Sequence, residues 1–351
     1  NRNISGWNTT YTNDMTSMFY YALEFDQDLS GWITNSVLTM RGMFNTAIKF
    51  NCLGNPMLTS GNVWQTAQVL DMGFMFKEAR VFNSDISNWD VANVTTMESM
   101  FQGASTFNQD ISFWTPTAVE STRSMFEGDY ALPHLFNQNI SGWVMPVLSD
   151  LGRMFGNTLN FNQPVGSWVS ATNGSFTKLD QVFRLARAFT QPLNAWNTAN
   201  VDTMSAAFYG CPFNSSLSNW DTALVTDMSY MFGSGAGLPC LFNQPLSTFD
   251  TSMVLDMSHM FRGNTTFNQP LVTSNPIWDV GTVQNFESMF HFASVFDQDL
   301  SSWVMSSAEN CKHMFYGALA FSGDLSSWVL NTVTNMCGMF RLTDNFNSAL
   351  T

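Results

Sequence analysis

The hydrophobic and polar positions of this chain recur with a basic period of 25 residues. Aligned on the phrase "MF", the chain divides into thirteen units whose anchor positions lie 24 to 32 residues apart. The anchors are Met18, Met43, Met75, Met100, Met125, Met154, Val182, Ala207, Met231, Met260, Met289, Met314 and Met339. A period of this length is typical of repeat proteins whose successive turns stack and bury the same columns of side chains.

Tryptophan occupies one column of the repeat. Trp7 begins this column, and Phe249 fills its one vacancy. The members that we expect in a core ladder are Trp32, Trp64, Trp89, Trp114, Trp143, Trp168, Trp196, Trp220, Trp278, Trp303 and Trp328. An aromatic residue at constant phase is typical of a core filler. The alternative is an exposed platform on which sugar rings stack.

Two patterns alternate inside one unit. In "VTTMESMFQGA", residues 94–104, apolar residues follow a spacing of three and then four, which predicts a short helix. The phrase "FNQDISFW", residues 107–114, predicts a short strand that pairs in parallel with its neighbours. Its Asn and Gln are expected to form amide ladders along the stack. Insertions fall between these phrases, as in "EGDYALPHL" (127–135) and "GSGAGLPCL" (233–241), which predicts loops there.

The phrase "NVTTMESMFQGASTFNQDISFW", residues 93–114, resembles the repeat of the BspA-type leucine-rich-repeat surface proteins, in the variant rich in "MF" and "FNQ". The resemblance covers essentially the whole chain. It implies a leucine-rich-repeat-like solenoid, a position at the cell surface or outside the cell, and adhesive or partner-binding roles. It implies no catalytic residue.

Together these patterns predict an α/β solenoid. We expect a leucine-rich-repeat-like, right-handed stack of about thirteen turns, each with one short parallel strand and one short helix. Residues 1–351 are expected to form a single continuous repeat domain without caps at either end. Because a bare terminal turn exposes apolar columns, we expect the caps either outside this segment or from another copy of the protein. The second arrangement would build a head-to-tail filament.

Composition narrows the function. Only 11% of the residues are charged and the formal net charge is −14, so nucleic acid and anionic membranes are unsuitable partners. The sequence contains no uninterrupted apolar run long enough for a transmembrane segment. Seven N-x-S/T sequons suggest a secreted glycoprotein; their asparagines are Asn3, Asn8, Asn93, Asn139, Asn173, Asn214 and Asn264.

Few side chains suggest chemistry. Asp85 and Asp110, and likewise Asp299 and Asp324, occupy one position in adjacent units; they are candidate calcium ligands, with a solvated polar face as the plainer interpretation. Cys211 and Cys240 are candidates for a disulfide because both stand two residues before the Phe of "FNQ".

The remaining cysteines and the histidines suggest no site. Cys311 lies in a Met column and is expected to be a free core thiol. The four histidines (His134, His259, His291 and His313) have no ligand spacing and are interpreted as surface and loop residues. No cofactor and no enzymatic activity are expected.

Three functions follow from these observations. The first is a non-enzymatic extracellular or cell-surface protein for adhesion or protein–protein interaction, whose partner is a protein or glycan ligand on a cell surface. The second is a structural subunit of an extracellular filament or wall layer that binds copies of itself end to end. The third is a glycan-binding module that uses exposed aromatic side chains.

Overall fold

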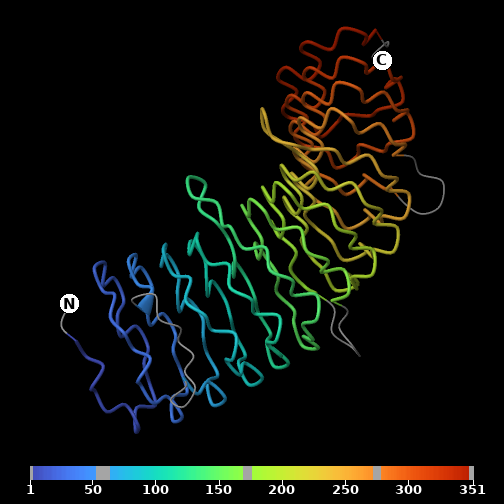
Figure 1. The fold of residues 1–351 in the computed structure, drawn as a ribbon. Helices are drawn as coiled ribbons and strands as arrows, with labels where there is room; N and C mark the ends of the chain where they lie inside the picture. Colours follow the sequence, from blue (N-terminus) through green and yellow to red (C-terminus); the bar gives the residue numbers. More distant parts are fainter. Residues whose placement is uncertain (1–2, 53–63, 169–175, 272–277, 348–351) are drawn as a thin grey trace. The chain divides into compact units, whose positions relative to one another are not determined.

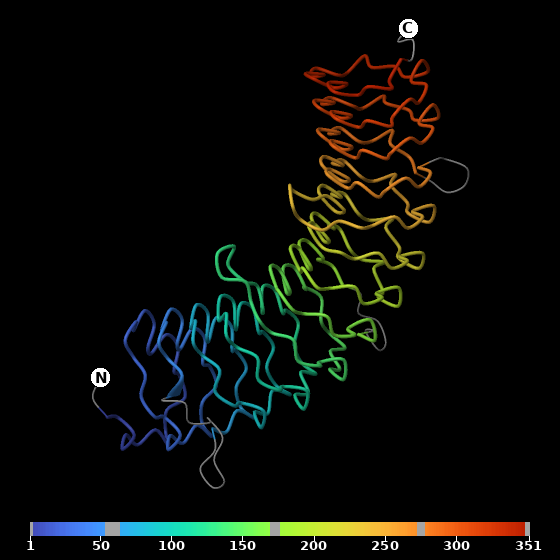
Figure 2. The same ribbon diagram turned by 45° about the horizontal axis from the view of Figure 1, so that its top comes forward.

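The computed structural model describes residues 3–52, 64–168, 176–271 and 278–347. The chain forms two compact units, Asn1–Gly174 (unit 1) and Ser175–Thr351 (unit 2). In each unit the chain runs in irregular coils that lie one against the next (Figure 1). Figure 2 shows the coils of unit 2, coloured from yellow to red, from a second side.

The predicted α/β solenoid is wrong. In the four described ranges there is no α-helix and no sheet, and parallel pairing is limited to isolated β-bridges. The bridges of unit 1 join Asp14, Thr39, Asp71, Thr96, Ser121 and Asp150 in sequence, with one more between His134 and Thr158. Those of unit 2 join Lys178, Thr203, Asp227, Asp256, Asn285, Asn310 and Asn335. Apart from the His134–Thr158 bridge, every bridge residue stands four positions before an anchor, so the insertions leave the register unchanged.

The segment expected to be a helix is a run of tight turns. Ser99 and Gly103 have positive φ angles of 52° and 70°, whereas a helix needs φ near −63°. Their N–H groups donate to carbonyls of the next coil, at Arg123 (2.8 Å) and Glu127 (2.9 Å). The N–H of Gln102 donates three residues back, to the carbonyl of Ser99 (3.2 Å). Alternate residues thus close turns or join coils. Glycine suits position 103 because the φ angle there is positive, and glycine adopts a positive φ without a steric cost.

The segment expected to be a strand is joined to the preceding coil by hydrogen bonds that involve side chains. No bridge of the described residues falls within residues 107–114. Instead, the N–H of Asn108 donates to the side-chain oxygen of Asn83 (2.9 Å), and the Gln109 amide donates to the carbonyl of Asn83 (2.7 Å). The same contact recurs from Asn243 to Asn214 (2.9 Å) in unit 2. The predicted amide ladders are therefore confirmed, although the strand is not.

Three aromatic columns fill the core of each unit. Phe101 stacks on Phe107 of its own coil at 3.9 Å between ring centroids and on Phe126 of the next coil at 5.8 Å. Trp114 stacks on Trp143 at 6.1 Å. In unit 2, Phe232 and Phe242 repeat the first contact at 3.8 Å. Phe101 and Phe232 are at most 1% exposed. Burial of these aromatic columns away from water therefore stabilises both units in the same way.

Candidate binding surface

In the turns beside the bridges, two positions per repeat flank the anchor, one directly before it and one two residues after it. Some of these positions are buried, as at Ser99, Ala206 and Ser288. In unit 2 these positions hold a set that we call the aromatic–basic stripe: Arg184, Tyr209, Tyr230, His259, Arg262, His291, His313, Tyr316 and Arg341. All of them are at least partly exposed to solvent. Because the bridges fix the register of the coils, the nine side chains of the stripe recur at constant places relative to the buried anchors.

Neighbouring members of the stripe touch one another. The rings of Tyr209 and Tyr230 meet edge to face at 5.8 Å, and Tyr230 stacks on His259 at 4.2 Å with 11° between the ring planes. Further along, Tyr316 contacts His291 at 4.7 Å and His313 at 5.3 Å. These side chains are therefore packed against each other and hold defined orientations.

Two of the three arginines of the stripe lie over tyrosine rings. Arg184 stands over the ring of Tyr209 at 5.7 Å, and Arg341 over that of Tyr316 at 5.5 Å. Within the described part of unit 2, neither guanidinium forms an ion pair, and neither does that of Arg262. A cation over a ring face is held in place while its N–H donors stay available.

Two histidines of the stripe, His259 and His291, are neutral at pH 7. Burial lowers the pKa of His259 to about 4, and the nearby Arg262 guanidinium lowers it further. Burial, followed by Arg262, also lowers the pKa of His291 to about 4. The Nδ1 atoms of both rings are buried and have no hydrogen-bond partner among the described residues. His259 and His291 therefore add no positive charge to the stripe at neutral pH, whereas its three arginines do.

Two cavities open beside the stripe. The first, of about 420 Å³, is lined by Gln181, Arg184, Ser205, Ala206, Tyr209, Ser229 and Tyr230. The second, of about 350 Å³, lies between the inserted segment 234–238 and a wall that includes Arg262 and Phe292. Both combine a guanidinium with an aromatic ring, which is a combination suited to an acidic ligand that also has an apolar face.

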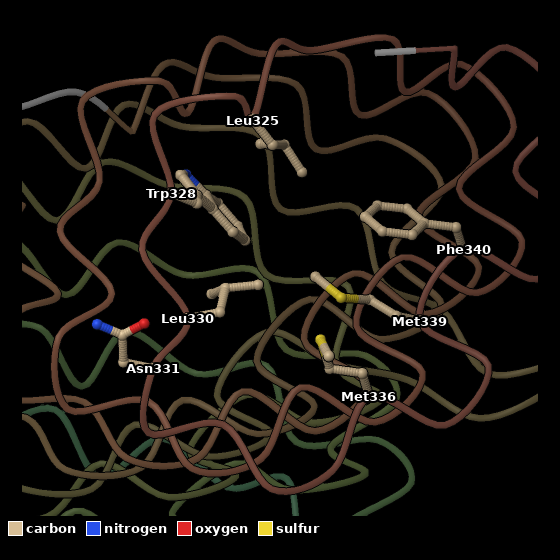
Figure 3. Close-up of a pocket in the computed structure, with 7 residues that line it drawn as sticks. All are labelled: Leu325, Trp328, Leu330, Asn331, Met336, Met339 and Phe340. Carbon is tan, nitrogen blue, oxygen red and sulfur yellow. The ribbon is translucent and has the colours of Figure 1, made fainter. Parts of the chain in front are cut away.

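A third cavity, of about 330 Å³, lies in the last described coils (Figure 3). Its lining is Leu325, Trp328, Leu330, Asn331, Met336, Met339 and Phe340. Only the Asn331 side chain among these carries a hydrogen-bonding amide, and none of the seven is charged. This cavity continues the core columns and offers no group for chemistry.

The comparison with known families identifies the kind of protein. The model of a family described as "Mycoplasma protein of unknown function, DUF285" matches residues 1–55, 55–168, 129–179, 177–276 and 241–351. The chain belongs to this family. No curated protein and no solved structure matches it. The match agrees with a repeat protein of the surface or interaction class, while the BspA-type relationship stays a resemblance.

In this DUF285 chain the predicted Trp ladder lies inside. Its eleven members are at most 7% exposed, so their rings offer no platform to a sugar. The indole nitrogen donates to a carbonyl of the preceding coil, as from Trp114 to Ile86 (3.2 Å) and from Trp143 to Ile111 (3.0 Å). Trp89 and Trp278 are exceptions, with no partner for the buried indole nitrogen in the described part of the chain.

The four candidate calcium ligands close tight turns. Each carboxylate accepts the N–H two residues later: Asp85 from Ser87, Asp110 from Ser112, Asp299 from Ser301 and Asp324 from Ser326, all at 2.8 to 2.9 Å. The hydrogen bonds from Ser301 lower the pKa of Asp299, against a raising effect of the Asp324 charge. No three His, Cys, Asp or Glu side chains of the described residues are grouped to hold a metal ion.

The candidate disulfide is absent, because Cys211 and Cys240 are free buried thiols. Cys211 donates to the carbonyl of Phe189 (3.4 Å) and Cys240 to that of Phe232 (2.8 Å). Burial raises the pKa of Cys240 to about 12 and that of Cys211 still higher. Both thiols are therefore protonated at neutral pH and act as core residues. Cys311 is likewise a buried free thiol.

The sequon asparagines of the described residues differ in their exposure to solvent. Asn3, Asn8, Asn93, Asn139 and Asn214 are exposed, and Asn173 lies outside the described residues. Asn264 is fully buried: its amide donates to the carbonyl of Phe242 (3.0 Å), and its oxygen accepts the N–H groups of Thr266 and Phe267 (both 3.0 Å). Asn264 is therefore corrected to a structural residue, because its nitrogen is not accessible to a glycosylating enzyme.

Sequence reasoning missed the stripe and misplaced one histidine. His134 was expected at the surface but is fully buried, where it accepts the N–H of Phe136 (3.2 Å) and contacts the carbonyl of Phe101 (3.1 Å). The other three histidines belong to the stripe. Their signal was the position relative to the anchor, one residue before it or two after it, rather than any spacing between histidines. Among the described residues no helix is long and apolar enough to cross a membrane.

Proposed function

We propose that this chain is a non-enzymatic protein of the cell exterior that acts in adhesion or protein interaction, with the aromatic–basic stripe as its contact surface. The observation that carries the proposal is the placement of Arg184 and Arg341, which form no ion pair among the described residues and lie over tyrosine rings on a backbone of constant register. Exposed Arg and Tyr that are held rigidly are typical of interaction hot spots, since little entropy is lost when they bind.

A binding role explains the stripe better than catalysis does. The buried cysteines of unit 2 are protonated, so they offer no nucleophile. His259 and His291 are neutral and packed against aromatic or basic neighbours, which suits a surface of fixed shape. Proteins whose repeats stack in register commonly display variable side chains on one face for recognition.

Attachment to cells tests this proposal. Beads coated with residues 1–351 are expected to attach to cultured epithelial cells at least about five times more than albumin-coated beads. Replacing the three stripe arginines together (Arg184→Gln, Arg262→Gln, Arg341→Gln) should remove most of this attachment, because these cations make the proposed contacts. The variant should still fold, because the three side chains lie outside the core. Equal attachment of albumin-coated beads, or full attachment of the triple variant, would contradict the proposal.

Two further measurements address location and assembly. Antibodies against the chain should label intact cells that produce it, and labelling only after permeabilisation would rule out an exterior position. Light scattering should give a concentration-independent mass near 39.3 kDa. Long polymers would favour the filament subunit instead.

A further inference from the structure

The first cavity beside the stripe is built from three successive coils of unit 2. Gln181 and Arg184 come from one coil, Ser205 and Tyr209 from the next, and Ser229 and Tyr230 from the third. Because the coils are joined by parallel bridges at Lys178, Thr203 and Asp227, these side chains are held at fixed positions relative to each other. A volume of about 420 Å³ accommodates one sugar residue.

Two polar side chains of this cavity, those of Arg184 and Gln181, are available to a ligand. The guanidinium of Arg184 has no ion pair, and the amide of Gln181 makes no side-chain hydrogen bond, within the part of the chain that the structure describes. The hydroxyl groups of Ser205 and Ser229 bond to each other at 2.8 Å. An arginine fork matches a carboxylate, while an amide and two hydroxyls match the hydroxyl groups of a saccharide.

The aromatic wall is rigid. Tyr230 is fixed by stacking on His259, and its edge contact with Tyr209 at 5.8 Å orients the second ring beneath the Arg184 cation. Burial raises the pKa of Tyr230, so its phenol stays neutral at physiological pH. A neutral ring of this kind packs against the C–H face of a pyranose.

The surrounding carboxylates are already engaged, which leaves Arg184 to the ligand. Asp202 accepts both short contacts from Lys178 (2.5 and 2.8 Å). Asp227 accepts the N–H of Ser229 (2.8 Å). Lys178 therefore offsets the charge of Asp202, and neither carboxylate is paired with Arg184.

An acidic peptide fits this cavity less well than a sugar. The main-chain N–H groups of the wall are used between coils: Gln181 donates to Ser205 (2.8 Å), Ala206 to Ser229 (2.7 Å) and Tyr230 to Ser258 (2.9 Å). An added strand would find no free backbone edge here. The net negative charge also repels a polyanion over long range, whereas a sugar with one carboxylate is affected little.

We infer that this cavity binds a carboxylate-bearing sugar residue of a glycan, with Arg184 on the carboxylate, Tyr209 and Tyr230 on the ring face, and Gln181, Ser205 and Ser229 on the hydroxyl groups. This inference rests on the proposed role in adhesion, for which it names the ligand class. It assigns the recognition of sugars to partly exposed tyrosines and not to the buried tryptophans.

Calorimetry and saturation-transfer NMR with four probes test the inference: methyl β-D-glucuronide, the methyl glycoside of N-acetylneuraminic acid, neutral methyl β-D-glucoside, and hexaglutamate. At least one acidic glycoside should bind at least about tenfold more tightly than the neutral one, because the neutral glycoside lacks the carboxylate that Arg184 would bind. Binding of neither acidic glycoside, equal binding of the neutral one, or tighter binding of hexaglutamate would overturn the inference.

Variants locate the site. Arg184→Gln should weaken binding of the acidic glycoside about tenfold or more, and Arg184→Lys should weaken it less, since lysine keeps the charge but not the fork. The matched control is Arg187→Gln, because Arg187 is exposed nearby but does not line the cavity. Equal effects at both positions would overturn the assignment; unfolding is checked by the melting temperature of each variant.

The two proposals fail in different ways. If excess acidic glycoside leaves bead attachment unchanged while the triple arginine variant abolishes it, the sugar assignment is wrong and the adhesive surface stands. If coated beads never attach but the acidic glycoside binds in an Arg184-dependent manner, the cavity assignment stands and the adhesive role is wrong.

Discussion

Units 1 and 2 place different side chains at the same positions of the same repeat. Two residues after the anchor, unit 1 carries residues such as Asn45, Gln102 and Glu127, and Gln102 donates to the carboxylate of Glu127 (2.8 Å). The corresponding positions of unit 2 include Tyr209 and Arg262.

Cations over rings and ion pairs occur in both units: Arg41 and Lys77 of unit 1 lie over Phe74 at 4.6 and 5.5 Å, and Lys178 and Lys312 of unit 2 pair with Asp202 and Glu287. The arginines nevertheless differ in their ion pairing. In unit 1, Arg41 pairs with Asp71 (3.1 Å) and Arg123 with Asp150 (3.2 Å). In unit 2, Arg184 and Arg341 lie over tyrosine rings without an ion pair among the described residues. The same core columns and backbone hydrogen bonds stabilise the fold of both units. The exposed positions do not determine the fold, so their side chains can either pair with one another or remain available to bind a partner.

Core substitutions should show that the two units share one stabilising principle. Phe126→Ala in unit 1 and Phe232→Ala in unit 2 each remove a fully buried ring that stacks on neighbours within about 4 to 6 Å. Each should lower the free energy of unfolding by about 3–5 kcal/mol in urea denaturation. The control Phe113→Ala removes a ring that is 78% exposed and should cost less than about 0.5 kcal/mol. If only one of the two core variants lost several kcal/mol of unfolding free energy, the two units would not be stabilised in the same way.

Acid should destabilise unit 1 through a residue that unit 2 lacks. Burial lowers the pKa of His134 to about 4, while Cys240 occupies the corresponding place in the unit 2 insertion. The unfolded chain then binds more protons than the folded one below pH 6.5, so stability falls as the pH drops from 6.5 towards 4. Between pH 7 and pH 5, His134 alone should contribute about 2 kcal/mol to this loss, and His259 and His291 of unit 2 add contributions of the same sign.

Denaturation of the wild type and of His134→Gln at pH 7 and pH 5 measures this loss. Protonated His134 can no longer accept the N–H of Phe136, which is the structural cause of the effect. The variant should show a smaller pH dependence than the wild type. An unchanged difference between the two pH values would show that other groups, such as His259 and His291, dominate.

Glycan attachment should distinguish an exposed sequon of unit 1 from a buried one of unit 2. In a secretory expression host, Asn139 should accept a glycan and Asn264 should not, since only Asn139 is exposed. Mass spectrometry of glycopeptides reads this directly. Asn264→Ala should instead cost about 1–3 kcal/mol of stability, because buried partners lose their hydrogen bonds. A glycan found on Asn264 would contradict its buried placement.

Ion-pair substitutions should have the smallest effect. Arg123→Gln in unit 1 and Lys312→Gln in unit 2 each remove a partly exposed pair, Arg123 with Asp150 and Lys312 with Glu287. Each should cost less than about 1 kcal/mol, and less still at high salt. Arg123→Gln should also leave binding of the acidic glycoside unchanged. A loss of binding there would show that the two surfaces are not functionally distinct.

Much of the packing could be predicted from the sequence, and the local conformation could not. A residue repeated at constant phase has the same environment in every coil, so the Trp column and the amide ladder through Asn83 and Asn108 could be anticipated. The helix could not be excluded, because the spacing of Met97, Met100 and Phe101 suits a helix and a run of tight turns equally. The free thiols of Cys211 and Cys240 also depend on distances that sequence does not contain.

The sequence by itself determined which side chains share a column and that insertions leave the register intact, because stacking forces identical positions to pack together. Only the tertiary structure decided the backbone path and the outward surface. Positive φ angles at residues such as Ser99 and Gly103 direct alternate N–H groups to carbonyls of the next coil, which is incompatible with a helix. The contacts that make Arg184, Tyr209 and Tyr230 one cavity come from three different coils, so no single stretch of sequence encodes them.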